Sequence, residues 1–528
     1  MKRRLLLLLS FPALIHAQPV SLDPGFGHNG AAVSQTEGWG KEASNIIRQP
    51  DGKLVVAGVE WKKGDMIIQQ SIITRFLPDG QLDNSFGAQG TAKLITGNKN
   101  GAQAISLQTD GKIVVAANET IIQQQGNSVT LLSRPFIARL NADGSPDAGF
   151  GTNGILSLEL LDAHFMDKDL AAIAVLPNGK ILAGGSGLTA AGSKMIVLRL
   201  NADGSYDNSF GVSGLGQYTI ENGMNAGLWD MAVQDDGKVI LAGTSGSSSL
   251  PTHDDLSFAL ARIHADGTPD VTFGTQGMVT TRLSGPFGLE ILDIAHRVLV
   301  QADGRIYLAG AAGRVLGLAR YLPDGSPDPT FGQNGKIVHP AHPAATGIAL
   351  RNGKLYACGM LPVADYVLDI SLSAFNADGS ADNTFAPDGL LTTHIYDENY
   401  AHALLIQPDG KLVTAGALSH GPGSGEGGLL LTRLMSGATT GIVSQTGKQA
   451  SITLYPNPAD EELTLAFNTS SGMPQCDIII TSATGQIVYT GSFTAAKIKI
   501  PVDHLAAGIY AVRVNTGTGV QTLRFTKK

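Results

Sequence analysis

A motif that recurs about every 60 residues constrains this 528-residue chain more than any other feature. Complete or partial copies of Asp-Gly-x-x-Asp-x-x-Phe-Gly-x-x-Gly contain phenylalanines that lie 60, 64, 60, 63, 58 and 54 residues apart. A chain with such a period is an array of one supersecondary unit, because a single repeat cannot bury its apolar face alone. The seven phenylalanines are Phe26, Phe86, Phe150, Phe210, Phe273, Phe331 and Phe385.

A second motif alternates with the first and predicts a β-hairpin. In its first copy, Asp51-Gly52 stands between apolar runs and is followed by Lys53-Leu-Val-Val-Ala-Gly58. An Asp-Gly pair in that setting favours a tight turn, because glycine adopts positive φ without strain. The motif occurs at residues 49–58, 108–117, 176–185, 234–243, 301–310, 350–359 and 407–416.

Each unit is predicted to contain four strands. The hairpin supplies two, a third ends at the arginine that opens the long motif, as at Arg75, and a fourth follows Phe-Gly-x-x-Gly. The high glycine content, 66 of 528 residues, fits many short strands joined by turns, and the low charged fraction of 16 % excludes a disordered or coiled-coil chain. Four short strands repeated radially predict an all-β fold, a β-propeller.

The ends of the repeat region indicate whether the array is open or closed. Residues 22–30 match the second half of the long motif, and residues 433–437 match its first half. The two fragments complete one motif, whereas an open solenoid would need atypical polar caps at its ends. We therefore predict a closed seven-bladed β-propeller over residues 21–437, with its seam inside that motif.

The Asp-Gly-Lys hairpin together with Asp-Gly-x-x-Asp-x-x-Phe-Gly resembles the delta-60 repeat β-propeller family of bacterial exported proteins. The resemblance covers residues 21–437 and extends over seven copies of the hairpin. It implies the propeller fold, and the family carries no established activity.

The N-terminus is predicted to be a secretory signal peptide, residues 1–17. Lys2, Arg3 and Arg4 precede an apolar run from Leu5 to Ile15, and Ala17 supplies a small residue at the cleavage point. The run is shorter than the 18–20 residues or so that a membrane anchor needs. A net charge of −8 without a long basic run also argues against a nucleic-acid partner. We expect export without a transmembrane segment.

After a small, polar linker at 438–450, residues 451–528 are predicted to form a small immunoglobulin-like β-sandwich, because strand-like runs alternate with turns. These residues resemble the type A sorting domain of the type IX secretion system. The motif residues are Tyr455, Pro456, Asn457, Pro458, Gly485, Gly508 and Tyr510. The resemblance implies a Bacteroidota-type outer membrane, engagement of the type IX machinery, and removal of the domain after passage to the surface or the medium. The alternative is an accessory binding sandwich.

No constellation in the sequence predicts catalysis or a cofactor. The repeated aspartates, such as Asp79 and Asp83, fit turns whose backbone they hydrogen-bond, and they lack the closing glutamate of a calcium loop. His339 with His342, and His394 with His402, are pairs without an evident third ligand. We predict no metal site.

The symmetry of the repeat separates two faces. The Asp-Gly turns and links all fall on one, the regular face, whereas segments of variable length fall on the other, the irregular face. Function concentrates on loops held by a rigid scaffold. We predict a binding or adhesion module for a glycan or protein on the irregular face; the alternative is a secreted polysaccharide hydrolase or lyase. The candidate ligand-binding residues are Trp39, His164, Trp229, His342 and Tyr396.

Overall fold

The computed structural model describes residues 20–528 except 64, 98, 126–127, 221–224, 247–255, 284–291, 365–366, 397, 420–426, 436–450, 469–475, 483–486, 496 and 516–519. The predicted signal peptide and linker lie outside the described residues. The chain divides into two compact units, residues 1–437 and 438–528, and each is described by itself.

The first unit is built from four-stranded antiparallel blades, seven within the described residues. The first four blades are β3 (Trp39–Arg48), β4 (Leu54–Lys62), β5 (Asp65–Phe76), β6 (Thr91–Leu94); β7 (Asn100–Leu107), β8 (Ile113–Gln125), β9 (Ser128–Leu140), β10 (Ile155–Ser157); β11 (Asp167–Val175), β12 (Ile181–Thr189), β13 (Gly192–Leu200), β14 (Leu215–Tyr218); and β15 (Asn225–Val233), β16 (Val239–Gly246), β17 (Leu256–Ile263), β18 (Met278–Thr281). The last three are β19 (Asp293–Val300), β20 (Ile306–Ala312), β21 (Val315–Tyr321), β22 (Lys336–Pro343); β23 (Gly347–Arg351), β24 (Lys354–Ala364), β25 (Val367–Phe375), β26 (Leu390–Thr393); and β27 (Glu398–Ile406), β28 (Leu412–Ser419), β29 (Gly427–Met435), β2 (Ala31–Ser34).

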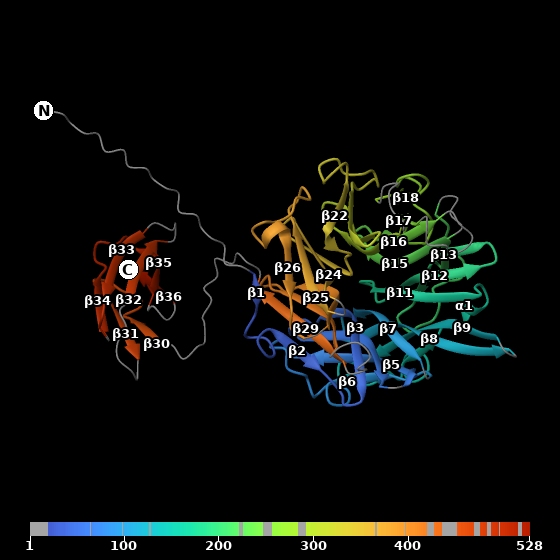
Figure 1. Cartoon of the computed structure of the whole chain (residues 1–528), viewed down its shortest axis with the longest axis horizontal. Helices are drawn as coiled ribbons and strands as arrows, with labels where there is room; N and C mark the ends of the chain where they lie inside the picture. Colours follow the sequence, from blue (N-terminus) through green and yellow to red (C-terminus); the bar gives the residue numbers. More distant parts are fainter. Residues whose placement is uncertain are drawn as a thin grey trace. The chain divides into compact units, whose positions relative to one another are not determined.

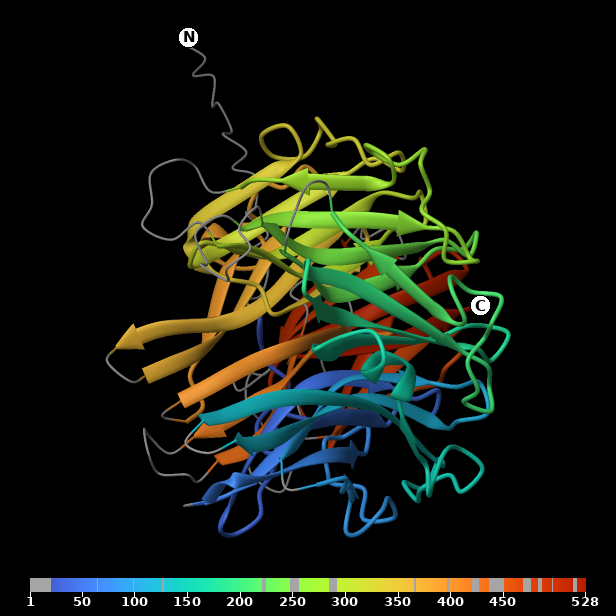
Figure 2. The ribbon, with the colours of Figure 1, turned by 90° about the vertical axis from the view of Figure 1, so that its right-hand side faces the viewer.

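The first strand of every blade lies at the centre of the ring. β3, β7, β11, β15, β19, β23 and β27 each contact the next, and β27 contacts β3. Figure 1 follows the blades around the ring in chain order, from blue through green and yellow to orange. In Figure 2 the long strands of successive blades are seen from the side, with the short helix α1 (Glu159–Asp162) in teal toward the viewer. The seven-bladed propeller is confirmed.

The structure also gives the blade phase, which the sequence left open. A blade begins with the first hairpin strand and ends with the strand after Phe-Gly-x-x-Gly, so β5 pairs with β6 rather than β6 with β7. The hairpin turns and the long links therefore share the regular face. The loops between the second and third strands and the connections between blades share the irregular face.

The two ends of the repeat region close the ring. β1 (Ser21–Leu22) and β2 both pair with β29 of the last blade, where orange meets blue in Figure 1. Arg433 Nε donates to Asp23 Oδ2 at 2.8 Å, which joins the two halves of the split motif across the seam.

A repeated charge network holds the blades at the regular face. The arginine that ends the third strand donates to the second aspartate of its link, at 2.5–2.8 Å in the six blades that have it. Its guanidinium also lies 4.4–4.8 Å from the centre of the buried phenylalanine ring and donates to a backbone carbonyl of the next blade. In the sixth blade Ala374 replaces the arginine, so Asp382 keeps Lys354, the hairpin cation whose counterparts also pair with the link aspartate in the other blades.

Glycine is required where the links approach the neighbouring blade. Gly80 has φ +88, and a Cβ there would meet Gly27 N at 2.8 Å and the Phe26 ring at 3.0 Å. Gly87 has φ +55, and its Cβ would lie 2.5 Å from Thr91 O. The glycines thus permit both the turn and the close approach of one backbone to another.

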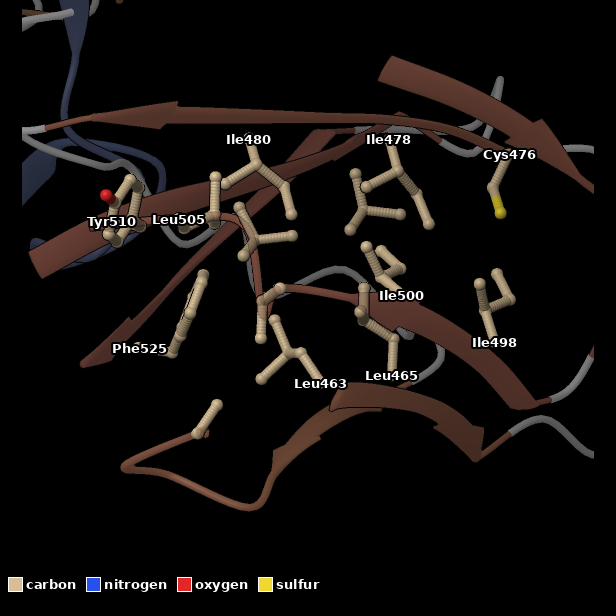
Figure 3. Packing of buried hydrophobic residues seen from close by; sticks show 14 of the residues in the cluster. Leu463, Leu465, Cys476, Ile478, Ile480, Ile498, Ile500, Leu505, Tyr510 and Phe525 are labelled. Carbon is tan, nitrogen blue, oxygen red and sulfur yellow. The ribbon is translucent and has the colours of Figure 1, made fainter. Parts of the chain in front are cut away.

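The second unit is a β-sandwich of two antiparallel sheets. One contains β30 (Ser451–Tyr455), β31 (Glu462–Asn468) and β34 (Lys497–Pro501); the other contains β33 (Ile487–Phe493), β32 (Cys476–Ser482), β35 (Gly508–Asn515) and β36 (Val520–Lys527). Alternate residues of the strands face inward, as the period of two demands. Ile478 and Ile480 of one sheet face Leu465 and Ile500 of the other in a fully buried core (Figure 3). The predicted sandwich is confirmed.

Candidate functional site

The five residues predicted to bind a ligand do not come together. Trp39 is half-buried at the start of β3, with Lys93 Nζ 5.2 Å from its ring centre, and His164 is exposed just after α1. Tyr396 is half-buried between β26 and β27. Of the five, Trp229 alone lines the cavity described below, where 44 % of its surface is exposed.

His342 is placed in the interior, which corrects the expectation that it faces a ligand on the irregular face. It is 1 % exposed, its Nδ1 lies 2.8 Å from Ser373 Oγ, and its Nε2 lies 3.0 Å from Asp388 O. A buried imidazole with two hydrogen-bond partners offers no surface to a glycan or a protein, so His342 is left out of that ligand site.

A cavity of about 840 Å³ lies on the propeller axis toward the irregular face. It is lined by the first halves of the inner strands, including Glu42 and Ser44 of β3, Gln103 of β7, Trp229 of β15 and His402 of β27. Its volume falls in the range of small-molecule sites, about 300–1,000 Å³. Such a cavity at the convergence of the blades is the strongest candidate for a binding site.

A bulge recurs in the inner strands and places one residue per blade in the cavity wall. In β3, for example, Ala43 pairs with Gly58 and Asn45 with Ala57, so Ser44 is left between them. The same shift occurs in five other inner strands, and Thr346 occupies the corresponding position before β23. A bulge re-aims the extra side chain. We name these the bulge ring: Ser44, Gln103, Ala171, Trp229, His296, Thr346 and His402.

Two members of the bulge ring, Ser44 and Thr346, form hydrogen bonds that connect neighbouring blades. Ser44 Oγ donates toward Ala57 O of its own blade at 3.1 Å and toward Ala102 O of the next blade at 2.6 Å. Thr346 Oγ1 makes the corresponding contacts with Cys358 O and Ala401 O, at 3.1 and 2.5 Å. These hydroxyls tie neighbouring inner strands together.

The three aromatic members of the bulge ring, Trp229, His296 and His402, lie in blades 4, 5 and 7, and they contact each other or charged neighbours. The Trp229 and His296 rings pack edge to face, with centres 5.4 Å apart. His402 Nε2 lies 2.8 Å from Glu42 Oε1 and so joins the last blade to the first. Arg297 Nη2 reaches His402 O at 3.4 Å.

His296 is held neutral and oriented. Burial lowers the pKa of His296, and the positive charge of Arg297 lowers it further. The hydrogen bond to Ala345 O raises it, but not enough to offset burial. Nδ1 donates to Ala345 O at 2.8 Å, because a carbonyl only accepts, so Nε2 is left as an acceptor. Burial also disfavours the charged form of Asp169 in the cavity wall, and so raises the pKa of this carboxyl group.

The two histidine pairs noted in the sequence have different environments. His394 Nδ1 lies 2.7 Å from Asp369 Oδ1, and His402 has Glu42, so each has its own carboxylate. His339 and His342 instead share Asp388, which the sequence analysis missed as a third candidate ligand. Its position 46 residues beyond His342 hides that proximity, although it alone places an acid where the other links have Asn, Gln or Ser.

The sorting-motif residues lie at strand ends of the sandwich. Tyr455 is 43 % exposed, with Lys497 Nζ 5.5 Å from its ring centre, and Asn457 Oδ1 accepts a hydrogen bond from Thr526 N at 2.9 Å. Pro456 and Pro458 flank Asn457 and are exposed. Tyr510 is buried against Phe525, two residues after the half-buried Gly508. Gly485 lies outside the described residues.

The fold and its tail define an exported repeat propeller that ends in a sorting domain. Family models match both parts: "Domain of unknown function (DUF5122) beta-propeller" at residues 49–86, 108–150, 176–210, 234–273 and 301–331, and "Secretion system C-terminal sorting domain" at residues 453–528. The chain is thus a delta-60 repeat propeller with a type IX secretion tail, and its destination is the medium or the outer-membrane surface. Among the described residues, no helix has the length and apolar character to cross a membrane.

Solved structures similar to the chain include PorZ, described as an essential surface component of the type IX secretion system of Porphyromonas gingivalis. It is 13 % identical over 90 % of this chain and 68 % of its own, with a TM-score of 0.32. A protein of unknown function from Dyadobacter fermentans is 11 % identical over 78 % of this chain and all of its own, with a TM-score of 0.36. No curated protein matches the chain. TM-scores this low support no functional argument.

Proposed function

We propose that the propeller binds the end of a glycan in its axial cavity, at the surface or in the medium to which the sorting domain delivers it. The observation that carries the proposal is the exposed indole of Trp229 in a cavity of about 840 Å³ whose wall also contains polar side chains such as Gln103, His296 and His402. No cofactor is implied.

The chemistry of the wall suits a sugar. An aromatic ring packs against the apolar C–H face of a pyranose, while amides, imidazoles and carboxylates exchange hydrogen bonds with its hydroxyls. Trp229 offers the ring, Gln103 an amide, and His296 an acceptor nitrogen held in a fixed orientation. Because these groups lie on rigid inner strands, little conformational entropy is lost on binding.

A folded protein partner is supported less well, because a hollow of this volume suits a small group rather than a broad surface. A hydrolase or lyase remains the second candidate, since Asp169 is a carboxyl group of raised pKa in the same cavity wall. The two outcomes differ in a simple observation: a binding module leaves the oligosaccharide intact, and an enzyme releases products.

The test is binding of the full chain to a glycan array, followed by calorimetry and product analysis with the oligosaccharide that binds best. Trp229→Ala should weaken the affinity at least tenfold, as loss of a central aromatic anchor does. Trp39→Ala is the matched control, because Trp39 lies outside the cavity wall, and it should leave the affinity unchanged. Equal affinity of Trp229→Ala and the unaltered chain, or absence of any bound glycan, would overturn the proposal.

A further inference from the structure

The outer strand of the fifth blade departs from the repeat. β22 has eight residues, whereas the outer strands β2, β6, β10, β14, β18 and β26 have three or four. The extra length carries His339-Pro-Ala-His342, and the register against β21 shifts between Val315 and Leu316 to accommodate it. These two histidines are therefore additions to the scaffold rather than parts of it.

The facing turn of the sixth blade departs from the repeat at one position. Asp388, within η2 (Pro387–Gly389), has φ +53, a left-handed conformation that recurs at the same position of the other links. There the residue is uncharged in every case: Asn29, Gln89, Asn153, Ser213, Gln276 and Asn334. The backbone conformation belongs to the fold, and only the carboxylate is particular to this blade.

The histidines of β22 and the carboxylate of Asp388 lie close together. One ligand atom from each of His339, His342 and Asp388 lies within 4.8 Å of the others, and Asp388 Oδ2 is 3.8 Å from Nε2 of both histidines. Two imidazole nitrogens and a carboxylate form a donor set that Zn²⁺ prefers, with bonds of about 2.0–2.2 Å. Ligand atoms around such an ion are about 3.4 Å apart, so the three groups must draw slightly closer together to bind it. The Asp388 side chain is 62 % exposed and therefore has room to move.

The environment orients the rings as ligands. The ring centres of His339 and His342 are 3.9 Å apart, and Phe375 packs against both. His339 Nδ1 is buried without a hydrogen-bond partner among the described residues, so the protein leaves this nitrogen unsatisfied. His342 Nδ1 lies 2.8 Å from Ser373 Oγ, the kind of second partner that fixes a metal-binding imidazole.

We propose that His339, His342 and Asp388 bind one Zn²⁺ ion that links the fifth and sixth blades. Without the ion, His342 Nε2 carries a proton and donates to Asp388 O at 3.0 Å. Binding replaces this hydrogen bond with a metal–nitrogen bond; the ring proton then resides on Nδ1, which donates to Ser373 Oγ. A water molecule takes the fourth position on the solvent side. Because the ion binds the native state, it stabilises the contact between the two blades.

The experiment is calorimetric titration of the full chain, purified without a polyhistidine tag and stripped with a chelator, with zinc chloride. We expect one equivalent to bind and the melting temperature to rise with zinc. Asp388→Asn should weaken binding at least tenfold and abolish the thermal shift. This variant should fold, because Asn occupies the same left-handed position at Asn334. Ser373→Ala should weaken binding by about 10- to 100-fold.

The matched control is Asn334→Asp, which adds a carboxylate at the corresponding position of a link that lacks the histidine pair. It should leave the zinc affinity unchanged. Zinc binding of Asp388→Asn equal to that of the unaltered chain, or no binding by the unaltered chain, would overturn the proposal. Neither outcome bears on glycan binding, which is measured at a different site.

Discussion

The regular and irregular faces of the propeller use repetition in opposite ways. On the regular face, the hairpin cation and the link aspartate meet in all seven blades, from Lys53 with Asp83 to Lys411 with Asp23. On the irregular face, a repeated bulge presents side chains as different as Ala171 and Trp229. The same backbone symmetry thus repeats one stabilising ion pair at the regular face, and at the irregular face it presents a different side chain in each blade for binding.

Acid should affect the regular face most, because its ion pairs titrate together. Burial alone would raise the pKa of Asp83, but hydrogen bonds from Ser85 and the charge of Arg75 outweigh it and lower the pKa to about 2; Asp328 is similar. An unfolded aspartate has a pKa of about 3.9, so between pH 4 and 2 the unfolded chain binds more protons than the native one. The free energy of unfolding should therefore fall steeply from pH 4 to 2, as measured by denaturant titration. A flat profile over this window would contradict the assignment.

Arg199→Ala should give the next largest effect. It removes the 2.5 Å ion pair with Asp207, the contact with the Phe210 ring and the hydrogen bond to Ala265 O of the next blade. Lys180 Nζ still lies 2.6 Å from Asp207 Oδ2, so the buried carboxylate keeps one cation. The loss should therefore lie at or below the low end of the roughly 3–5 kcal/mol of a fully broken buried pair, which chemical denaturation should detect. Asp203→Asn, in an exposed turn of the same link, is the control and should cost far less. Equal losses would show that the network is no more important than an ordinary turn.

His402→Ala should give the smallest loss of stability, because it alters the irregular face rather than the ion-pair network of the regular face. It removes the half-buried contact with Glu42 between the last blade and the first, for which about 0.5–1 kcal/mol is expected. The same variant should weaken binding of the selected oligosaccharide several-fold, since His402 lines the cavity. A stability loss as large as that of Arg199→Ala, with unchanged binding, would reverse the roles assigned to the two faces.

The regular face could be predicted from the sequence because each contact is encoded by neighbouring residues and repeated many times. The repeated aspartates predicted the turns, and the structure places the link that contains them between the third and fourth strands of one blade. Closure was also predictable, since residues 22–30 and 433–437 complete one motif.

The cavity and the histidine cluster could not be predicted in this way. The bulge residues share a backbone position but no residue type, so no pattern marks Ser44 and Trp229 as equivalent. The contact of Asp388 with His342 depends on the packing of one blade against the next. The length of β22 and the single acid among the link positions were the available signals. The acid can be read by aligning the repeats in the sequence, whereas the length of β22 and its contact with the acid appear only in the structure.

Closure through β2 and β29 has a consequence for the order of events during export. Six blades draw their strands from one continuous stretch, but the last needs a strand from each end of the repeat region, about 400 residues apart. The last blade is therefore completed only when β29 and β2 are on the same side of the membrane. Until then β29 is an unprotected sheet edge, available to any other strand it meets. The residues of β1 and β2 thus cover the edge of β29, and their detachment would expose this edge to strands of neighbouring chains.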